Sequence, residues 1–308
     1  MSIRVLETHK GSPAGLRFSE RDNPQPDHGE VLIEVRHISL NFGESRRSAL
    51  NLEPNGSVLG WDAAGIVIGV GPKTEAPAIG TRVVTRALRG GWAQQRLARV
   101  TDIAVVPDDV DLAIAATLPT AAVTALGTLQ VGGPILGRTV LITGASGGVG
   151  RFAIQLAKLG GARVIASVGS EASGVGLAEL GADVVTVGLD DVREGVDLVV
   201  ESVGGRQLVQ AFNLLNRDGN IQSLGWASQE EAVFGNLGTV GRSGRHIHGF
   251  LISEYAIAPL VKPLLGWIAD GRLKVDVTWR GSWENYAEAI DTLVGRRLYG
   301  KAVLDVAK

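Results

Sequence analysis

Residues 139–158 decide the fold of the second half of the chain: Thr139-Val-Leu-Ile-Thr-Gly-Ala-Ser-Gly-Gly-Val-Gly-Arg-Phe-Ala-Ile-Gln-Leu-Ala-Lys158. The apolar run at 140–142 is typical of a buried parallel strand. Four glycines follow at positions 144–150, where a backbone without Cβ atoms can turn sharply and approach a ligand. Apolar residues at helical spacing come next, and the amides at a helix N-terminus favour phosphate oxygens. The stretch therefore predicts a dinucleotide pyrophosphate site with contacts from Ser146, Gly147, Gly148 and Val149.

Strands and helices alternate on the C-terminal side of this stretch. Strands are predicted near 139–143, 163–168, 183–187, 196–200, 219–224 and 246–251, and helices near 148–160, 171–180 and 205–215. This alternation is typical of a doubly wound parallel sheet, in which ligands bind at the carboxyl ends of the strands. We therefore expect the loops after the fourth to sixth strands to contact a dinucleotide, through Ser202, Val203, Gly225, Phe250 and Leu251.

The remaining residues have a different pattern. Residues 1 to about 115 form short β-like runs separated by turns, with little helical periodicity. After residue 252 we predict a helix near 254–270, a strand at 273–277, a helix near 283–295 and a closing strand at 301–305. The closing segment is expected to fold back onto the N-terminal region. The predicted domains are thus 118–252, inserted between 1–117 and 253–308.

Composition limits the function classes. The chain has 308 residues, a formal net charge of -2 and 45% hydrophobic residues, which is typical of a soluble globular protein with no preference for nucleic acid or membranes. No apolar segment is long enough for a bilayer, and no secretion signal is evident, so a cytoplasmic location is expected. The chain has no cysteine, which excludes thiolate nucleophiles and sulfur-ligated zinc. No ligand spacing links the five histidines, so no metal site is predicted: His9, His28, His37, His246 and His248.

Several further motifs occur in a recognisable order along the chain. They are the segments 39–44 (SLNFGE), 59–67 (LGWDAAGIV), 118–125 (LPTAAVTA), 201–205 (ESVGG) and 298–304 (LYGKAVL). With the glycine-rich stretch, they resemble the zinc-free, quinone oxidoreductase-like branch of the medium-chain dehydrogenase/reductase superfamily. The resemblance covers nearly the whole chain. It implies an α/β fold in which a Rossmann domain is inserted in a β-rich, GroES-like catalytic domain, and a homodimer formed through the open edge of the sheet. Zinc-dependent relatives carry Gly-His-Glu where this chain has Gly60-Trp61-Asp62.

The end of the second strand indicates which cofactor fits. Enzymes that use NAD usually have an acid there that binds the ribose 2′-hydroxyl. This chain has the small, uncharged residues Ser167, Val168, Gly169 and Ser170. They leave room for a 2′-phosphate, and Ser167 and Ser170 are candidates to donate hydrogen bonds to it. NADPH is therefore predicted in preference to NADH, with Arg193 as a candidate additional cation, although Glu171 would oppose a phosphate if it faced one.

Without a metal or an activated nucleophile, the protein's predicted task is to place a hydride donor against an electron-poor acceptor and to exclude water. A quinone or an α,β-unsaturated carbonyl compound fits that description. Asn41 is a candidate to bind a substrate carbonyl or a ribose, and Glu44 matches an acidic position of the family. Arg46, where many relatives carry tyrosine, is a candidate to stabilise negative charge on a substrate oxygen. Trp61 and Trp92 are candidates for the substrate pocket.

Alternative functions are reduction of an enoyl or polyketide-type double bond, and a non-catalytic role as an NADPH-binding redox sensor or crystallin-like protein. A short-chain dehydrogenase is excluded because such enzymes need a tyrosine followed four residues later by lysine. None of the three tyrosines, Tyr255, Tyr286 and Tyr299, has one. In that family the glycine-rich turn also lies near the N-terminus, whereas here it begins beyond residue 140.

Overall fold

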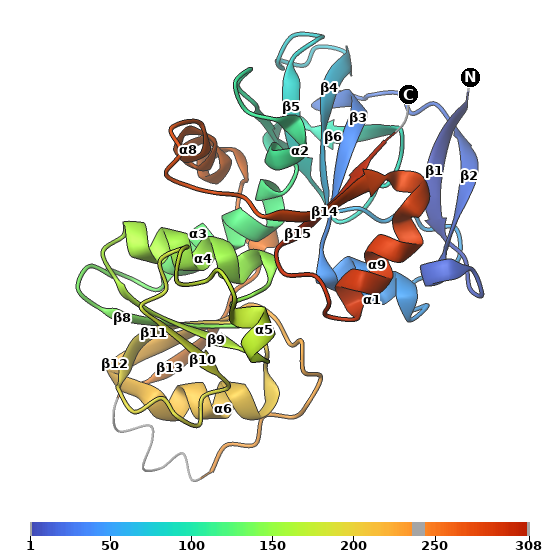
Figure 1. Cartoon of the computed structure of the whole chain (residues 1–308). Helices are drawn as coiled ribbons and strands as arrows, with labels where there is room; N and C mark the ends of the chain where they lie inside the picture. Colours follow the sequence, from blue (N-terminus) through green and yellow to red (C-terminus); the bar gives the residue numbers. More distant parts are fainter. Residues whose placement is uncertain (1, 236–243, 307–308) are drawn as a thin grey trace. The chain divides into compact units, whose positions relative to one another are not determined.

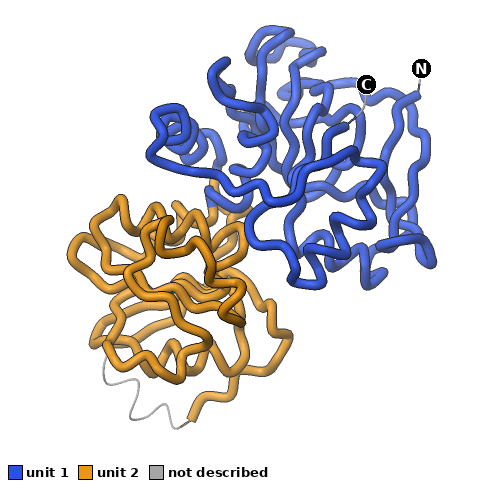
Figure 2. The backbone as a smooth tube through the Cα atoms, in the orientation of Figure 1, with its two compact units in different colours: residues 1–123, 256–308 blue, residues 124–255 orange. Residues whose placement is uncertain are grey.

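The computed structural model describes residues 2–235 and 244–306. The chain divides into two compact units, one made of residues 1–123 and 256–308 (unit 1) and one made of residues 124–255 (unit 2; Figure 2). These boundaries lie six and three residues later than the predicted domain limits at 117 and 252. The first difference arises because the π-helical turn η3 (Leu118–Ala122) packs against β4, β5 and α8 of unit 1.

Unit 1 is built on a seven-stranded sheet with the order β14-β15-β3-β4-β5-β7, in which β6 also pairs with β3 (Figure 1). A separate hairpin is formed by β1 (Ser2–Thr8) and β2 (Leu16–Asp22). The strands of the large sheet are β3 (Glu30–Leu40), β4 (Asp62–Val70), β5 (Arg82–Arg86), β6 (Gln95–Arg99), β7 (Ile103–Val105), β14 (Val277–Ser282) and β15 (Lys301–Asp305). The helices of unit 1 are α1 (Phe42–Ala49), α2 (Leu112–Ala115), α8 (Ala258–Ala269) and α9 (Tyr286–Val294).

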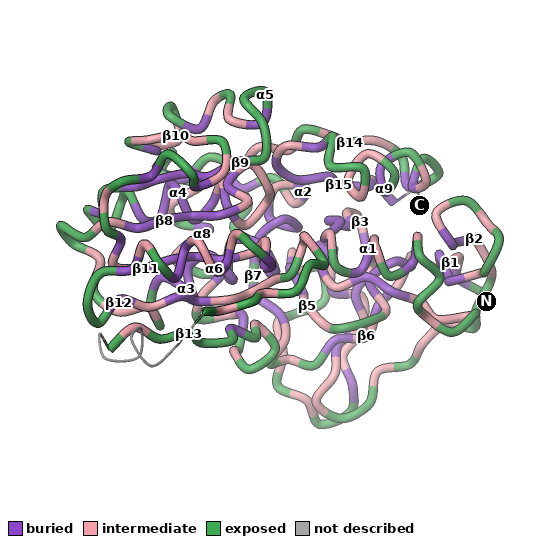
Figure 3. The backbone as a smooth tube through the Cα atoms, turned by 90° about the horizontal axis from the view of Figure 1, so that it is seen from below, coloured by how far each residue is buried: buried purple, intermediate pink, exposed green. Residues whose placement is uncertain are grey.

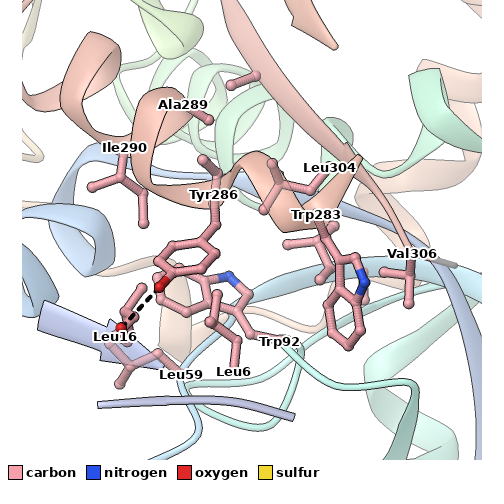
Figure 4. Close-up of a cluster of buried hydrophobic side chains, with 14 of the residues drawn as sticks. Leu6, Leu16, Leu59, Trp92, Trp283, Tyr286, Ala289, Ile290, Leu304 and Val306 are labelled. Carbon is pink, nitrogen blue, oxygen red and sulfur yellow. Dashed lines mark hydrogen bonds between the residues drawn. The ribbon is translucent and has the colours of Figure 1, made fainter. Parts of the chain in front are cut away.

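The strand β15 joins the two sequence-distant parts of unit 1. It pairs antiparallel with β3 and parallel with β14, and its residues Ala302, Val303 and Leu304 are fully buried. A core cluster beside this strand includes Leu6, Trp92 and Trp283 from three separate segments (Figure 4). Burial of such side chains contributes roughly 1.5–3 kcal/mol each. The closing strand thus pairs with a strand of the N-terminal part of the chain and is buried beside it.

Two sequence predictions for the C-terminal part of the chain need correction. The strand predicted at 273–277 is instead β14 at Val277–Ser282, because Leu273 is buried and its amide donates to the carbonyl of Trp267 at the end of α8. The predicted helix near 254–270 begins only at Ala258, where Pro259 occupies the first turn, a favoured place for proline.

Unit 2 contains a six-stranded, all-parallel sheet with the order β10-β9-β8-β11-β12-β13. The strands are β8 (Thr139–Thr143), β9 (Arg163–Val168), β10 (Val184–Val187), β11 (Val196–Glu201), β12 (Leu215–Ser223) and β13 (His246–Gly249). The helices are α3 (Val123–Val131, of which Val123 belongs to unit 1), α4 (Gly148–Leu159), α5 (Glu171–Gly174) and α6 (Gly205–Leu214). The order confirms the doubly wound Rossmann sheet, whose strand order reverses between β8 and β11.

The inner strands of this sheet are apolar and covered on both faces. Val140, Leu141 and Ile142 of β8 are all fully buried, and the tube through β8 and β11 is largely purple in Figure 3. The helix predicted near 171–180 is shorter, because α5 ends at Gly174 and Gly176 adopts a left-handed backbone (φ +79°) that ends helical geometry. Among the described residues, no helix has the length and apolarity that crossing a membrane requires.

Candidate functional site

The glycine-rich turn of unit 2 connects β8 to α4. Gly144 has φ +58°, a left-handed conformation that favours glycine, and Gly147 is the N-cap residue of α4. A Cβ atom on Gly150 would lie 2.6 Å from the Cα atom of Ala145, so a residue without a side chain lets the first turn of the helix pack on the preceding loop. Ser146, Gly147, Gly148 and Val149 are all partly exposed at the helix N-terminus, the kind of position that favours phosphate groups.

A second loop, after β11, is joined to this turn. Glu201 at the end of β11 is fully buried, and its Oε1 atom accepts hydrogen bonds from the amides of Val203 (2.8 Å) and Gly204 (2.9 Å). Thr143 Oγ1 also donates to Oε1 (3.1 Å). Burial raises the pKa of the Glu201 carboxyl group. Thr143 and Glu201 lie within two of the motifs quoted from the sequence, but neither was predicted as a site residue, because their contact with each other joins positions 58 residues apart.

The predicted cofactor residues of the later loops have different surroundings. Ser202, Val203 and Gly225 are partly exposed at the carboxyl edge of the sheet. Phe250 is 5% exposed and stacks on Tyr255, with ring centroids 5.1 Å apart, so its side chain is a packing element. Leu251 is 60% exposed. Of these two residues, Leu251 is therefore the one that is accessible from solvent.

The two serines predicted to bind a 2′-phosphate differ. Ser167 is fully buried; its hydroxyl donates to the carbonyl of Gly188 (3.0 Å) and accepts from Gln207 Nε2 (2.8 Å). Because a serine hydroxyl has one hydrogen, Ser167 has none left for a phosphate, and that prediction is corrected. The Ser170 hydroxyl donates to Ser173 Oγ (3.2 Å), but because the residue is exposed a phosphate can replace that acceptor, and Ser170 remains a candidate. Arg193 is exposed and donates to the carbonyl of Asp190.

Unit 1 contains a buried polar cluster, which we define as Asn41, Glu44, Asp62, Thr120 and Lys301. The sheet order explains it, because the end of β3 and the beginnings of β4 and β15 lie at the same end of the sheet. Asn41 Nδ2 donates to Glu44 Oε1 (3.1 Å) and to Asp62 Oδ2 (3.0 Å). Lys301 Nζ donates to Asn41 Oδ1 (2.8 Å) and to the carbonyl of Leu40 (2.8 Å).

This geometry changes the role that Asn41 can have. Its amide group has two hydrogens, and both are directed at carboxylates within the buried polar cluster. The side chain therefore has no hydrogen left for a substrate carbonyl, which corrects one of the two roles predicted from the sequence, whereas the other, binding a ribose, stays a prediction. What remains is the second lone pair of Oδ1, which can accept a hydrogen bond from a ligand hydroxyl.

Two further contacts fix the neighbouring backbone. Thr120 Oγ1 donates to Asp62 Oδ1 (2.6 Å), and the amide of Trp61 donates to Glu44 Oε2 (2.7 Å). Arg96, also almost fully buried, donates through Nη1 to the carbonyl of Trp61 (2.9 Å). Of these groups, only Asn41, Glu44 and Trp61 were predicted as site residues from the sequence. Asp62, Thr120 and Lys301 lie within family-like motifs but were given no role, and Arg96 was not predicted. A lysine within an apolar closing strand was a signal that could have been used.

Burial dominates the electrostatics of the cluster. It raises the pKa of Glu44 to about 8, with the charge of Asp62 adding to the effect, and it also raises the pKa of Asp62. Burial lowers the pKa of Lys301 and brings that of Arg96 down to about 10. The nearby lysine and the two carboxyl groups partly offset these shifts, because opposite charges favour the ionised forms.

A Glu44→Gln variant is expected to flatten the pH dependence of stability. A carboxyl whose folded-state pKa of about 8 exceeds its ordinary value of 4.5 binds a proton on folding, so stability is lost as the pH rises through that window. The loss should reach up to about 1 kcal/mol per pH unit. Unfolding by urea at pH 5.5 and pH 7.5 measures it. Glutamine loses one hydrogen-bond acceptor at both pH values, so the variant should be less stable than the wild type at pH 5.5, and this difference should shrink by pH 7.5. A parallel pH profile for both proteins would contradict the shift.

The remaining predicted residues of unit 1, Trp92, Trp61 and Arg46, differ in how far they are buried. Trp92 is 0% exposed within the core cluster, so it does not line an open pocket, and that prediction is corrected. Trp61 is partly exposed, and its ring lies so close to α1 that a Cβ atom on Gly43 would be 2.8 Å from it. Arg46 on α1 is partly exposed, and it forms no ion pair with another described residue.

The residues at the cluster do not fit a zinc ion. Zinc sites are built from thiolate, imidazole and carboxylate ligands, whereas this cluster combines two carboxyl groups with an amide and a buried ammonium group. In the described ranges 2–235 and 244–306, no group of three or more His, Cys, Asp or Glu residues is arranged to hold a metal. Lys301 already places a positive charge there.

Comparisons with known proteins agree with the architecture. Residues 27–110 match the family model described as "Alcohol dehydrogenase GroES-like domain", and residues 148–270 match the one described as "Zinc-binding dehydrogenase". The solved structure of AibC is 31% identical, with 100% of this chain and 96% of that chain covered and a TM-score of 0.88. The quinone oxidoreductase of Escherichia coli, solved in complex with NADPH, is 26% identical over 98% of this chain and 99% of its own, with a TM-score of 0.88.

Curated relatives include much larger proteins. Erythronolide synthase EryA2 of Saccharopolyspora erythraea is 35% identical over 217 residues, which are 66% of this chain and 6% of the synthase. The chain thus spans a small fraction of that relative's length. The full-length agreement with the two solved structures and the two matched domain models identifies the fold and the class of enzyme. The chain belongs to the medium-chain dehydrogenase/reductase superfamily, in its quinone oxidoreductase-like branch, and is an oxidoreductase.

Proposed function

We propose that the protein is a zinc-independent, NADPH-dependent reductase that transfers a hydride to a quinone or an α,β-unsaturated carbonyl compound. The observation that supports it most is the glycine-rich turn, where the helix packs so closely that a Cβ atom on Gly150 would overlap the backbone of Ala145. Such a turn at the reversal of the strand order is typical of dinucleotide-binding sheets. The NADPH complex of the Escherichia coli relative adds support for this cofactor.

We propose a separate contribution to the reaction for each unit. In unit 2, the backbone at 146–149 and the loops at 202–203, 225 and 250–251 bind and orient the cofactor, which supplies the hydride when bound. In unit 1, the buried polar cluster holds the amide of Asn41 in one orientation with its oxygen as the acceptor. Arg46 remains the candidate to stabilise negative charge on a substrate oxygen, and Trp61 the candidate to contact an aromatic substrate.

A second candidate is reduction of an enoyl or polyketide-type double bond. The similarity to erythronolide synthase EryA2 favours it, since reduction of a conjugated thioester uses the same hydride donor and needs no metal. Both candidates require an acceptor that is electron-poor through conjugation. They differ in the acceptor, so one assay can separate them.

The experiment is oxidation of NADPH and of NADH, followed by absorbance, with a panel of quinones, enones and enoyl thioesters. Quinone or enone turnover with NADPH is the expected result, whereas turnover of enoyl thioesters alone would favour the second candidate. Tight NADPH binding with no oxidation by any acceptor would indicate a redox sensor. A failure to bind either nucleotide would overturn the proposal.

Replacement of Ser170 with aspartate is expected to reduce the preference for NADPH over NADH about tenfold, which corresponds to ~1.4 kcal/mol. The new carboxylate would lie at an exposed position shortly after β9. There it would repel a 2′-phosphate, whereas it could accept a hydrogen bond from a 2′-hydroxyl. The dissociation constants of both nucleotides measure it. Ser282→Asp, an N-cap serine of unit 1 that aspartate can replace, is the matched control. An unchanged ratio would remove Ser170 from the assignment.

We also propose that the protein is a homodimer paired through β13, an edge strand of the parallel sheet. All four of its residues are exposed, and Ile247 is 38% exposed. An unpaired edge offers backbone hydrogen bonds to a second copy, and a two-fold axis makes such pairing self-complementary. Ile247→Lys is expected to yield a monomer in sedimentation experiments. Val185→Lys on the opposite edge strand β10 should leave the dimer intact, and equal effects of both changes would contradict the assignment to β13.

A further inference from the structure

The loops that follow β8 and β11 are joined by reciprocal hydrogen bonds. Thr143 Oγ1 donates to Glu201 Oε1 (3.1 Å) and accepts from the amide of Ser202 (3.0 Å), while Ser202 Oγ donates to the carbonyl of Thr143 (3.0 Å). We call these three residues the loop junction. The two strands are neighbours in the sheet, with Val200 opposite Ile142, so the junction lies where the strand order reverses.

The loop after β12 is attached to the same residues. The amide of Leu224 donates to the carbonyl of Glu201 (2.9 Å), and the amide of Ala227 donates to the carbonyl of Ser202 (3.1 Å). The glycine-rich turn is fitted to the junction as well, since a Cβ atom on Gly144 would lie 2.5 Å from Ser202 Oγ. Three loops with predicted cofactor contacts therefore depend on one set of hydrogen bonds.

The chemistry of Glu201 indicates that the junction is more than packing. The Glu201 side chain is fully buried, and its Oε2 atom has no hydrogen-bond partner among the described residues. A buried carboxyl with an unpartnered oxygen is costly, because burial removes the water that would otherwise solvate that oxygen. What the carboxyl provides is a fixed acceptor for the amides of Val203 and Gly204, which sets the path of the loop.

We propose that Thr143 and Glu201 are positioning residues for the nicotinamide cofactor: the loop junction holds the glycine-rich turn and the loops after β11 and β12 in the conformation that binds it. The inference rests on the proposed function, since it concerns the same cofactor. It assigns no contact between these two side chains and the ligand. They act through the backbone and through Ser202.

The test compares two substitutions of Thr143. Thr143→Val keeps the shape of the side chain but removes the hydroxyl, and it leaves Glu201 Oε1 without one donor and the amide of Ser202 without its acceptor. It is expected to weaken binding of both NADPH and NADP+ about tenfold, measured by calorimetry on folded protein. Thr143→Ser keeps the hydroxyl and should bind within about twofold of the wild type. Thr186→Val on the edge strand β10 is the matched control and should bind as the wild type does.

A purely structural role would lower the melting temperature of Thr143→Val without changing the affinity of the folded protein, and rescue by serine would then be absent from the binding data. Should Thr143→Val not fold, Thr143→Ala removes the same hydroxyl with a smaller side chain and is likewise expected to weaken NADPH binding about tenfold. Wild-type affinity in these variants, alongside a wild type that binds NADPH, would overturn this inference alone. No nucleotide binding by the wild type would overturn the proposed function and the inference with it.

Discussion

Replacing Lys301 with methionine is expected to lower the free energy of unfolding by about 3–5 kcal/mol, the usual cost of removing one partner of a buried ionic group. Lys301 is 4% exposed, and its ammonium group offsets the charges of Asp62 and Glu44. Without it, two buried carboxyl groups have no nearby cation of the same strength, and Asn41 Oδ1 loses its donor. Because protonation of the carboxyl groups relieves the repulsion, the loss should be larger at pH 8 than at pH 5.

Urea denaturation of the variant and of two companions measures this loss. Lys262→Met removes an exposed lysine of α8 and should change stability by less than about 0.5 kcal/mol. The double variant Asp62→Asn with Lys301→Met removes one of the buried charges and should recover part of the loss. Equal stabilities of the Lys262 and Lys301 variants would show that the ammonium group does not stabilise the cluster.

Replacing Gly150 with alanine is expected to destabilise unit 2 by about 3 kcal/mol, the upper part of the range for overpacking, and to abolish measurable NADPH binding. The added methyl group would lie 2.6 Å from the Cα and carbonyl oxygen atoms of Ala145. These are backbone atoms, so α4 would have to move away from the loop that precedes it. The cofactor's phosphate groups are proposed to bind at that same place.

Gly147→Ala is the matched control for folding. Its Cβ atom would have only the carbonyl oxygen of Gly144 nearby, at 3.4 Å, and the backbone of Gly147 (φ -76°) suits any residue. Its unfolding free energy should stay within about 0.5 kcal/mol of the wild type. A Gly150→Ala protein as stable as the Gly147→Ala protein, with unimpaired cofactor binding, would contradict the close packing of α4 on the turn.

The architecture of unit 2 was predictable from sequence because its signals are local. The buried run of β8, the glycines and the helix of α4 are contiguous, and each inner strand is an apolar run. The closing strand β15 was predicted for the same reason. In contrast, β14 has the sequence VTWRGS, and its residues alternate between partly exposed and exposed. Because this segment is polar, the sequence favoured the neighbouring segment at 273–277 as the strand.

The candidate site was less predictable because long-range contacts define it. The residues of the buried polar cluster are up to 260 positions apart, as the bond from Lys301 to Asn41 shows, and only the sheet order brings them together. The same limit explains the correction at Ser167. Its position after the glycines suited a phosphate, but Gly188 and Gln207 lie 21 and 40 residues away and use its hydroxyl. Burial also distinguishes the two tryptophans that the sequence predicted for the substrate pocket, because Trp92 is fully buried and Trp61 is partly exposed.

The position of β15 between β14 and β3 has a consequence for synthesis on the ribosome. All six strands of unit 2 are contiguous in the sequence and emerge before residue 256, so this unit can fold as soon as it is translated. Unit 1 has to wait, since residues 1–123 lack the strand that covers one edge of β3 until residues 301–305 emerge. During that interval Asp62 and Glu44 have no lysine beside them, and the nascent first segment exposes a strand edge that a chaperone could shield.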